Sequence, residues 1–245
     1  MLIRAILPAF LIIGFSGNAL AQQAIGTTQV IVRTVLGDLE SAQRTLAKAD
    51  PVHANENIIT RKDSATELRF IDETMIKVGP DAQVALDRFV FDPSSGAEQV
   101  TVNMVKGTLR FISGKMRKSA YAIRTPAATI SVRGTIFTLN VRGDGSTALH
   151  VEEGEVTVEG TGGGSVDVTA GLATTVTVTA APTPPAKPSV ALAIEVAKMD
   201  MLAALAGSVS SPMAVRKAGQ FGRSLPANSL PQKATDIPGA SCSSS

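Results

Sequence analysis

A succession of short segments, each alternating apolar and polar residues, is the feature that most constrains how this chain can fold. The segments run from Thr28 to about Ala180 and are separated by glycine, proline and other turn residues. Alternation with a period of two is typical of strands that bury one face. Many short strands with hardly a helical stretch between them predict an all-β domain and exclude a parallel sheet covered by helices.

The stretch from 121 to 137, YAIRTPAATISVRGTIF, indicates how brief these strands are. Apolar side chains occupy odd positions before residue 125, even positions from 128 to 132, and odd positions again from 137. Since residues of one parity share a face of a strand, each change of parity requires a bulge or a corner. The two changes fall at Thr125-Pro126 and at Arg133-Gly134-Thr135.

Glycine recurs where the parity changes. Pro126 lacks an amide donor and suits a corner, while Gly134 permits backbone conformations that a side chain forbids. Further changes of parity fall at Gly107 and Gly154. The glycines are too unevenly spaced for a regular β-helix, so we expect an irregular solenoid-like β domain, with a jelly-roll-like sandwich as the alternative.

The two ends of the chain differ from this β region. Residues 1–21 have a basic head, an apolar run and small residues before a cleavage point after Ala21, which predicts a signal peptide and a periplasmic or secreted protein. The alternative is an uncleaved membrane anchor, but the apolar run is short and Pro8 interrupts it. We expect the β domain to span residues 22–180.

The C-terminal part is predicted to contain one short helix. Residues 181–189 form a proline-rich linker, residues 190–206 an amphipathic helix, and residues 207–245 a disordered tail. We expect the apolar stripe of the helix to dock on the β domain; pairing with a partner or lying on a membrane surface are the alternatives. The stripe consists of Val190, Ile194, Ala197, Met201 and Leu205.

Charge and cysteine content exclude several classes of function. The formal net charge of +2 and the dispersed basic residues give no basis for a nucleic-acid partner. The densest basic group, Lys115 to Lys118, is interpreted as a solvated turn, with a phosphate or glycan site as the alternative. The only cysteine, Cys242, cannot form an internal disulfide, so packing and hydrogen bonds must hold the fold.

The sequence predicts no catalytic, metal-binding or cofactor-binding residue. The only histidines, His53 and His150, lack a second ligand at metal-binding spacing. Three carboxylates lie close together at Glu152, Glu153 and Glu155, and we interpret them as a solvated strand end. The alternative is glycosidic catalysis, which needs two carboxyl groups facing one cleft.

The corner residues also carry a family resemblance. The segment TPAATISVRGTIF resembles the Thr-Pro and Arg-Gly-Thr signature of the FecR domain, a periplasmic module, and VKGTLRF and VEEGEVTV are similar to its later segments. The resemblance covers roughly residues 28–178. It implies a solenoid-like all-β fold and a role in cell-surface signalling.

The chain departs from FecR itself at both ends. FecR is a sigma regulator with a cytoplasmic segment, a membrane helix and a C-terminal subdomain that contacts an outer-membrane receptor. Here the N-terminus is expected to be a signal peptide, and residues 181–245 lack the mixed strand and helix pattern of that subdomain. The resemblance therefore implies the β module alone, without the anti-sigma segment.

Arg133 has two interpretations within this motif. The first is structural: its guanidinium satisfies carbonyls or a carboxylate at the corner, with Glu153 as the candidate partner. The second is anion recognition at an exposed position. We treat Thr125, Pro126, Arg133, Gly134 and Thr135 as a structural motif.

The function predicted from the sequence is that of a non-catalytic binding or signalling module in the cell envelope. It would use exposed strands or the helix at 190–206 to contact an envelope protein or polymer, with no membrane span in the mature chain. The alternatives are a structural envelope protein that self-associates through strand edges and, third, an enzyme that acts on polysaccharides.

Overall fold

The alternating segments form strands that enclose an aliphatic core. The computed structural model describes residues 23–92 and 97–205, which lie within one structural unit, Met1–Ser208. The predicted signal peptide (residues 1–21) and tail (residues 207–245, with Cys242) lie outside the described residues. In chain order the described elements are β1 (Ala24–Val32), β2 (Val35–Leu39), β3 (Ala42–Thr45), β4 (Pro51–His53), β5 (Glu56–Thr60), β6 (Ala65–Phe70), β7 (Met75–Val78), β8 (Gln83–Asp92), β9 (Ala97–Ile112), the 3-10 helix η1 (Lys118–Ala120), β10 (Tyr121–Arg124), β11 (Ala128–Val132), β12 (Ile136–Val141), β13 (Thr147–Glu153), β14 (Glu155–Gly160), β15 (Ser165–Thr169), β16 (Ala173–Val176) and α1 (Val190–Leu205).

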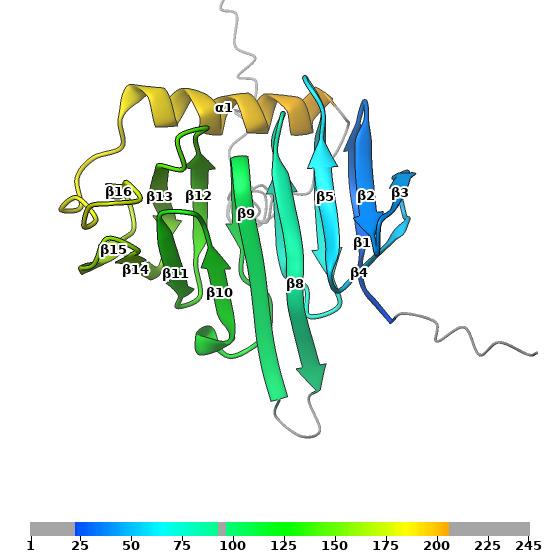
Figure 1. Cartoon of the computed structure of the whole chain (residues 1–245), viewed down its shortest axis with the longest axis horizontal. Helices are drawn as coiled ribbons and strands as arrows, with labels where there is room; N and C mark the ends of the chain where they lie inside the picture. The colour runs from blue at the N-terminus through cyan, green and yellow to red at the C-terminus, as the bar shows by residue number, and fades with distance from the viewer. Residues whose placement is uncertain (1–22, 93–96, 206–245) are drawn as a thin grey trace, which may run out of the picture. The chain divides into compact units, whose positions relative to one another are not determined.

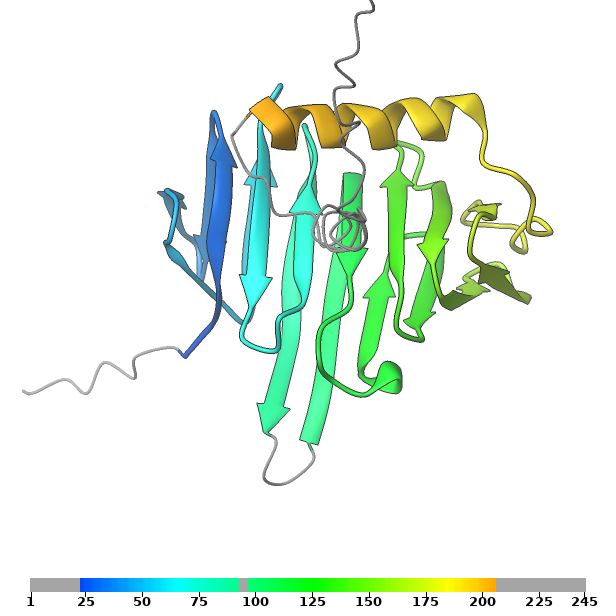
Figure 2. The same cartoon turned by 180° about the vertical axis from the view of Figure 1, so that it is seen from behind.

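The strands are arranged in two sheets that β9 joins (Figures 1 and 2). Sheet A has the order β4-β1-β6-β7-β9-β12-β13-β16. Sheet B has the order β3-β2-β5-β8-β9-β10-β11-β14-β15, and its β9–β10 pair is parallel. Because the chain crosses repeatedly from one sheet to the other, the predicted solenoid-like, all-β architecture is confirmed.

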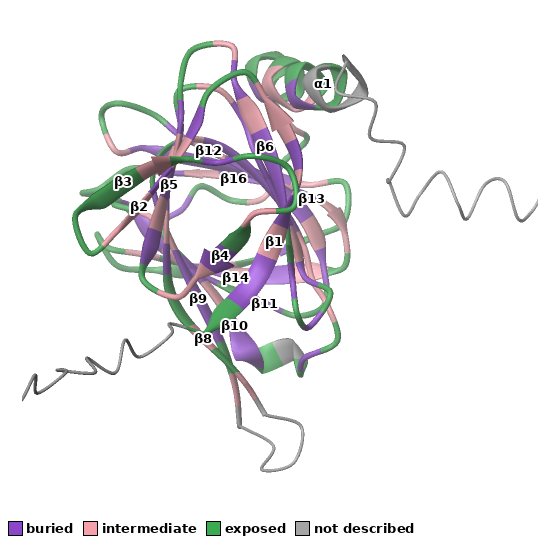
Figure 3. Ribbon diagram, turned by 90° about the vertical axis from the view of Figure 1, so that its right-hand side faces the viewer, coloured by how far each residue is buried: buried purple, intermediate pink, exposed green. Residues whose placement is uncertain are grey.

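The core lies between the two sheets, where Figure 3 shows the buried positions of the strands. Its centre is aromatic: Phe111 stacks on Phe137 with ring centroids 5.4 Å apart, and Tyr121 meets Phe111 edge-on at 5.5 Å. Aliphatic side chains of both sheets, such as Ile130 and Leu139, are fully buried around it. Burial of apolar area is therefore the main stabilising term.

The chain passes between sheets at glycine corners. Val132 ends β11 in sheet B and Ile136 begins β12 in sheet A, with Gly134 between them at φ +74°. The return passage, from β13 to β14, turns at Gly154 with φ +82°. A Cβ on Gly154 would lie 2.4 Å from the carbonyl oxygen of Gly134, so the two corners stack directly on each other.

Two other parts of the chain add strand structure. The first is the β2–β3 hairpin, in which Leu36 to Leu39 pair with Ala42 to Thr45. The proline-rich linker pairs with the edge of sheet A. Its Thr183 amide donates to the carbonyl of Thr175 at 2.9 Å, and Ala186 exchanges two backbone hydrogen bonds with Ala173.

Helix α1 packs against the outer face of sheet A, but the predicted stripe faces the wrong way. Leu192 and Met199 are the buried apolar residues of its described side chains, at 4% and 5% exposure. Val190, Ile194 and Met201 of the predicted stripe are exposed. On the side that is buried, Leu192 packs against Ala148 and Ala173, and the neighbouring Asp200 pairs with Arg110 at 2.8 Å. No described helix is long and apolar enough to cross a membrane.

A buried polar network anchors the loop that contains the basic group. The Tyr121 hydroxyl donates to Asp72 at 2.8 Å and accepts from the Met116 amide at 3.0 Å. Lys115 pairs with Glu73 at 2.7 Å, which agrees with a solvated turn rather than a free cationic site. Burial raises the pKa of Tyr121 to about 12, and the Asp72 carboxylate adds to the rise.

We predict that Gly154→Ala destabilises the protein far more than Gly171→Ala. Both glycines have nearly the same positive φ, +82° and +83°, but an added Cβ meets nothing within 4 Å at Gly171. The φ penalty alone gives a loss of about 1 kcal/mol, and the clash with the Gly134 carbonyl raises it to about 3 kcal/mol. Urea unfolding followed by circular dichroism measures both, and equal losses would show that the corners do not stack.

We also predict that Tyr121, the single tyrosine of a chain without tryptophan, titrates with a midpoint near pH 12 in the folded protein. The unfolded chain should titrate near pH 10. Because the folded state binds the proton more tightly, the stabilisation is complete below pH 10 and is lost as the pH rises through 12, on the order of 2–3 kcal/mol in all. Tyrosinate absorbance with and without denaturant measures both midpoints. A folded-state midpoint near 10 would contradict the buried network.

Candidate functional site

The residues of the predicted motif hold turns in place. Thr125 and Pro126 lie in the turn between β10 and β11, where the Thr125 hydroxyl accepts a hydrogen bond from the Ala128 amide at 3.0 Å. The Thr147 hydroxyl of β13 donates to the same oxygen at 2.8 Å. The turn of sheet B is thereby tied to sheet A.

The partner predicted for Arg133 is wrong. Its guanidinium lies 3.6 Å from a carboxylate oxygen of Glu155, not Glu153, and its side chain is 62% exposed. Gly154 turns the chain between the two glutamates, so only Glu155 follows β14 back beside the Arg133 corner. Thr135 is buried, and its amide donates to the Ser113 hydroxyl at 3.1 Å.

The acidic cluster is divided by the same corner. Glu152, in β13 of sheet A, pairs with Arg110, whereas Glu155, in β14 of sheet B, pairs with Arg133. The two histidines lie apart, His53 in β4 and His150 in β13. Among the residues that the structure describes, no three His, Cys, Asp or Glu side chains gather where they could hold a metal ion.

The structure brings together a set of charged residues of which the sequence singled out only Glu152. Glu67 of β6 is paired in register with Lys77 of β7, and Lys77 with Arg110 of β9. Thr138 of β12 continues the row, and its hydroxyl donates to Glu152 at 3.2 Å. We call Glu67, Lys77, Arg110 and Glu152 the charged row.

The charged row is nearly buried on the outer face of sheet A. Glu67, Lys77 and Arg110 are at most 8% exposed. Lys77 lies 3.3 Å from Glu67, and Arg110 binds Glu152 through one nitrogen and Asp200 of α1 through another, the latter at 2.8 Å. The helix therefore lies over the row, with its acidic residue bound to the arginine.

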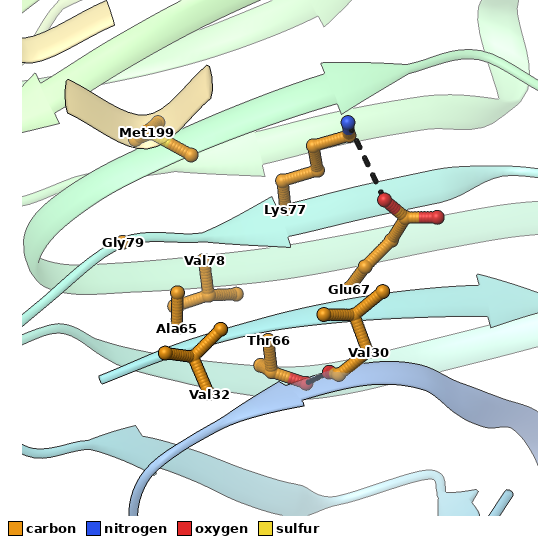
Figure 4. A pocket seen from close by; sticks show the side chains of 9 residues that line it. All are labelled: Val30, Val32, Ala65, Thr66, Glu67, Lys77, Val78, Gly79 and Met199. Carbon is orange, nitrogen blue, oxygen red and sulfur yellow. Dashed lines mark hydrogen bonds and ion pairs between the residues drawn. The ribbon is translucent and has the colours of Figure 1, made fainter. Parts of the chain in front are cut away.

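Two apolar sockets flank Arg110 and receive the buried residues of α1. Leu192 packs against Ala148 and Ala173 near one end of sheet A. Met199 lies over Gly79, in a pocket that Val30 and Lys77 also line (Figure 4). The cavity left beside Met199 is about 10 Å³, room for a single water at most. This face is suited to docking a chain segment, not to enclosing a small molecule.

The opposite side of α1 carries a second apolar surface. Val190, Ile194 and Met201 are 77%, 59% and 60% exposed. With about 3.6 residues per turn, they lie on the side of the helix opposite Leu192 and Met199. We call these three residues, with exposed Ala197, the outer stripe. What the site offers chemically is apolar contact and paired charge, which suits binding.

Part of this site had a signal in the sequence. Glu67, Lys77 and Arg110 each occupy the outward parity of a predicted strand, and Leu192 and Met199 are seven residues apart, as on one helix face. The sequence does not show that the three strands are neighbours in register, because β8 lies between β7 and β9 in the chain.

Comparison with known families identifies the β domain. Residues 56–157 match the family model described as FecR protein, a range that includes the motif from Thr125 to Thr135. This part of the chain is similar to the FecR family, and the resemblance drawn from the sequence is confirmed. The family match supports a signalling or regulatory role.

Solved structures show a more distant likeness. Two crystal structures of a candidate anti-sigma factor from Parabacteroides distasonis ATCC 8503 are 17% and 18% identical to this chain, with TM-scores of 0.45 and 0.44. The likeness covers 54% of this chain and spans 60% of theirs. A cell surface anchoring domain is 25% identical over 26% of this chain and 84% of its own, with a TM-score of 0.25. No curated protein matches the chain.

We predict that Arg110→Met lowers the free energy of unfolding by about 2–3 kcal/mol, since it leaves Glu152 without its cation in a poorly solvated position. Arg133→Met removes an exposed pair and should cost less than about 0.5 kcal/mol. Urea unfolding of the two variants compares the same chemical change at a buried and at an exposed site. Similar losses would contradict the assignment of the charged row as a buried network.

Proposed function

We propose that this protein is a non-catalytic module of the cell envelope, periplasmic or secreted, that acts in signalling by binding another protein through helix α1. One observation carries the proposal: α1 is apolar on two opposite sides, and only one of them is buried on sheet A. A helix that exposes an apolar side is suited to a partner surface.

The spacing of the outer stripe indicates the kind of partner. Its residues, at 190, 194, 197 and 201, are separated by four, three and four positions. This is the repeat of the seam between two packed helices. Exposed Lys198 flanks the seam, so a matching partner is an amphipathic helix with an acidic side chain opposite this lysine.

The sequence supports the proposed location, and the family match supports the proposed role. The basic head, apolar run and small residues of positions 1–21 are the pattern of an exported protein. The FecR match supports a regulatory role for the β domain. Contact with a sigma factor is not part of the proposal.

Self-association is the second candidate, because the outer stripe of one copy has the spacing to pack against that of another. Light scattering of the chain at high concentration separates the two. A dimer that disappears when the stripe is made polar favours self-association, and a monomer leaves binding to a different protein.

We predict that Ile194→Glu in a chain of residues 22–245 reduces capture of its partner from envelope extract roughly tenfold or more, because a buried carboxylate opposes the apolar seam. Quantitative pull-down measures the loss. Ala191→Glu is the matched control: it adds the same charge to an exposed position of the same helix, outside the stripe.

The identity of the captured protein tests the proposal further. An outer-membrane receptor would assign the signalling step, whereas recovery of sigma factors alone would contradict export. Equal capture by both variants would exclude the outer stripe as the contact surface.

A further inference from the structure

Helix α1 rests on sheet A through few contacts. Of its side chains described from Val190 to Met201, Leu192 and Met199 are buried, and Asp200 adds an ion pair that is half exposed. These contacts oppose the entropy of ordering a helix of sixteen residues and the linker before it. The net free energy of docking α1, which is the gain from these contacts minus the entropic cost of ordering, is therefore small.

The surface beneath α1 does not need the helix to keep its form. Arg110 is held by Glu152, and Glu152 by the Thr138 hydroxyl, all within sheet A. Lys77 and Glu67 pair with each other across adjacent strands. The two sockets are likewise built from residues of sheet A and its loops, including Ala148 of β13 and Gly79 just after β7.

The helix is also an imperfect occupant of this surface. Within the described part of the chain, Arg110 Nε and Glu67 Oε2 are buried without a hydrogen-bond partner, although Glu67 Oε2 has its ion pair with Lys77. A buried polar atom without a hydrogen bond weakens the complex that buries it. A segment that offered an acceptor to Arg110 and a donor to Glu67 would bind better than α1.

We propose that this face of sheet A is a binding site for an amphipathic helix, and that α1 is its exchangeable internal ligand. The site recognises two aliphatic side chains seven residues apart, one for each socket, followed directly by an acidic residue for Arg110. Leu192, Met199 and Asp200 define this pattern in α1. The site is separate from the outer stripe and does not depend on the partner proposed for that stripe.

The test uses the full chain and a labelled peptide. The peptide has the sequence of residues 190–205 with glutamine at 190, 194 and 201, so that it keeps the face that enters the sockets and cannot pack on the outer stripe. Fluorescence anisotropy gives its affinity for each protein. Because α1 competes in the same chain, the apparent affinity reports the fraction of molecules whose site is open.

Asp200→Lys should bind the peptide about tenfold more tightly than the unmodified chain, since the variant replaces the internal ion pair by a repulsion while the peptide keeps its own aspartate. Glu159→Lys is the matched control, with the same change of charge at an exposed position of β14 in sheet B, and should bind like the unmodified chain. A peptide with lysine in place of its own aspartate at position 200 should not show this tighter binding to Asp200→Lys.

A reversible disulfide between α1 and the loop after β7 provides the second measurement. In a Cys242→Ser background, Gly79→Cys and Met199→Cys place two thiols close together, because a Cβ on Gly79 would lie 3.3 Å from Met199 Cγ. The disulfide form should not bind the peptide, and reduction should restore binding. Peptide binding that the disulfide leaves undiminished, or no tightening in Asp200→Lys, overturns the proposal, whatever the pull-down on the outer stripe shows.

Discussion

The whole structure depends on one backbone constraint: the chain must turn between two sheets without leaving its aliphatic core open. With a single cysteine the chain cannot form an internal disulfide, so the turns themselves have to keep the two sheets together. Gly134 and Gly154 meet this requirement with positive φ and with a close approach of the two backbones that a side chain on Gly154 would prevent. Because the two corners stack, each passage between sheets also positions the next.

Much of the fold followed from parity and turn residues. The parity changes around Pro126, Gly134 and Gly154 mark a turn and two corners, because apolar side chains must face one core in every strand. Register between strands distant in sequence did not follow. It decides that Lys77 meets both Glu67 and Arg110, and no local pattern contains that information.

The helix was predicted at the right place and on the wrong side. Apolar residues occur on both sides of α1, so periodicity alone could not say which side the sheet would bury. The choice is made by shape and charge: Leu192 and Met199 fit the sockets while Asp200 reaches Arg110. The error is informative, since the true orientation leaves exposed the apolar surface on which the proposed function depends.

The pairing of the linker with β16 has a consequence for how copies of this protein can assemble. A solenoid ends in strand edges whose free amides and carbonyls would accept another chain. On β16, backbone groups of Thr183 and Ala186 in the linker already form hydrogen bonds with those amides and carbonyls. That border of sheet A is closed to growth by strand addition, so the segment that tethers α1 also limits the polymerisation to which stacked β-sheets are prone.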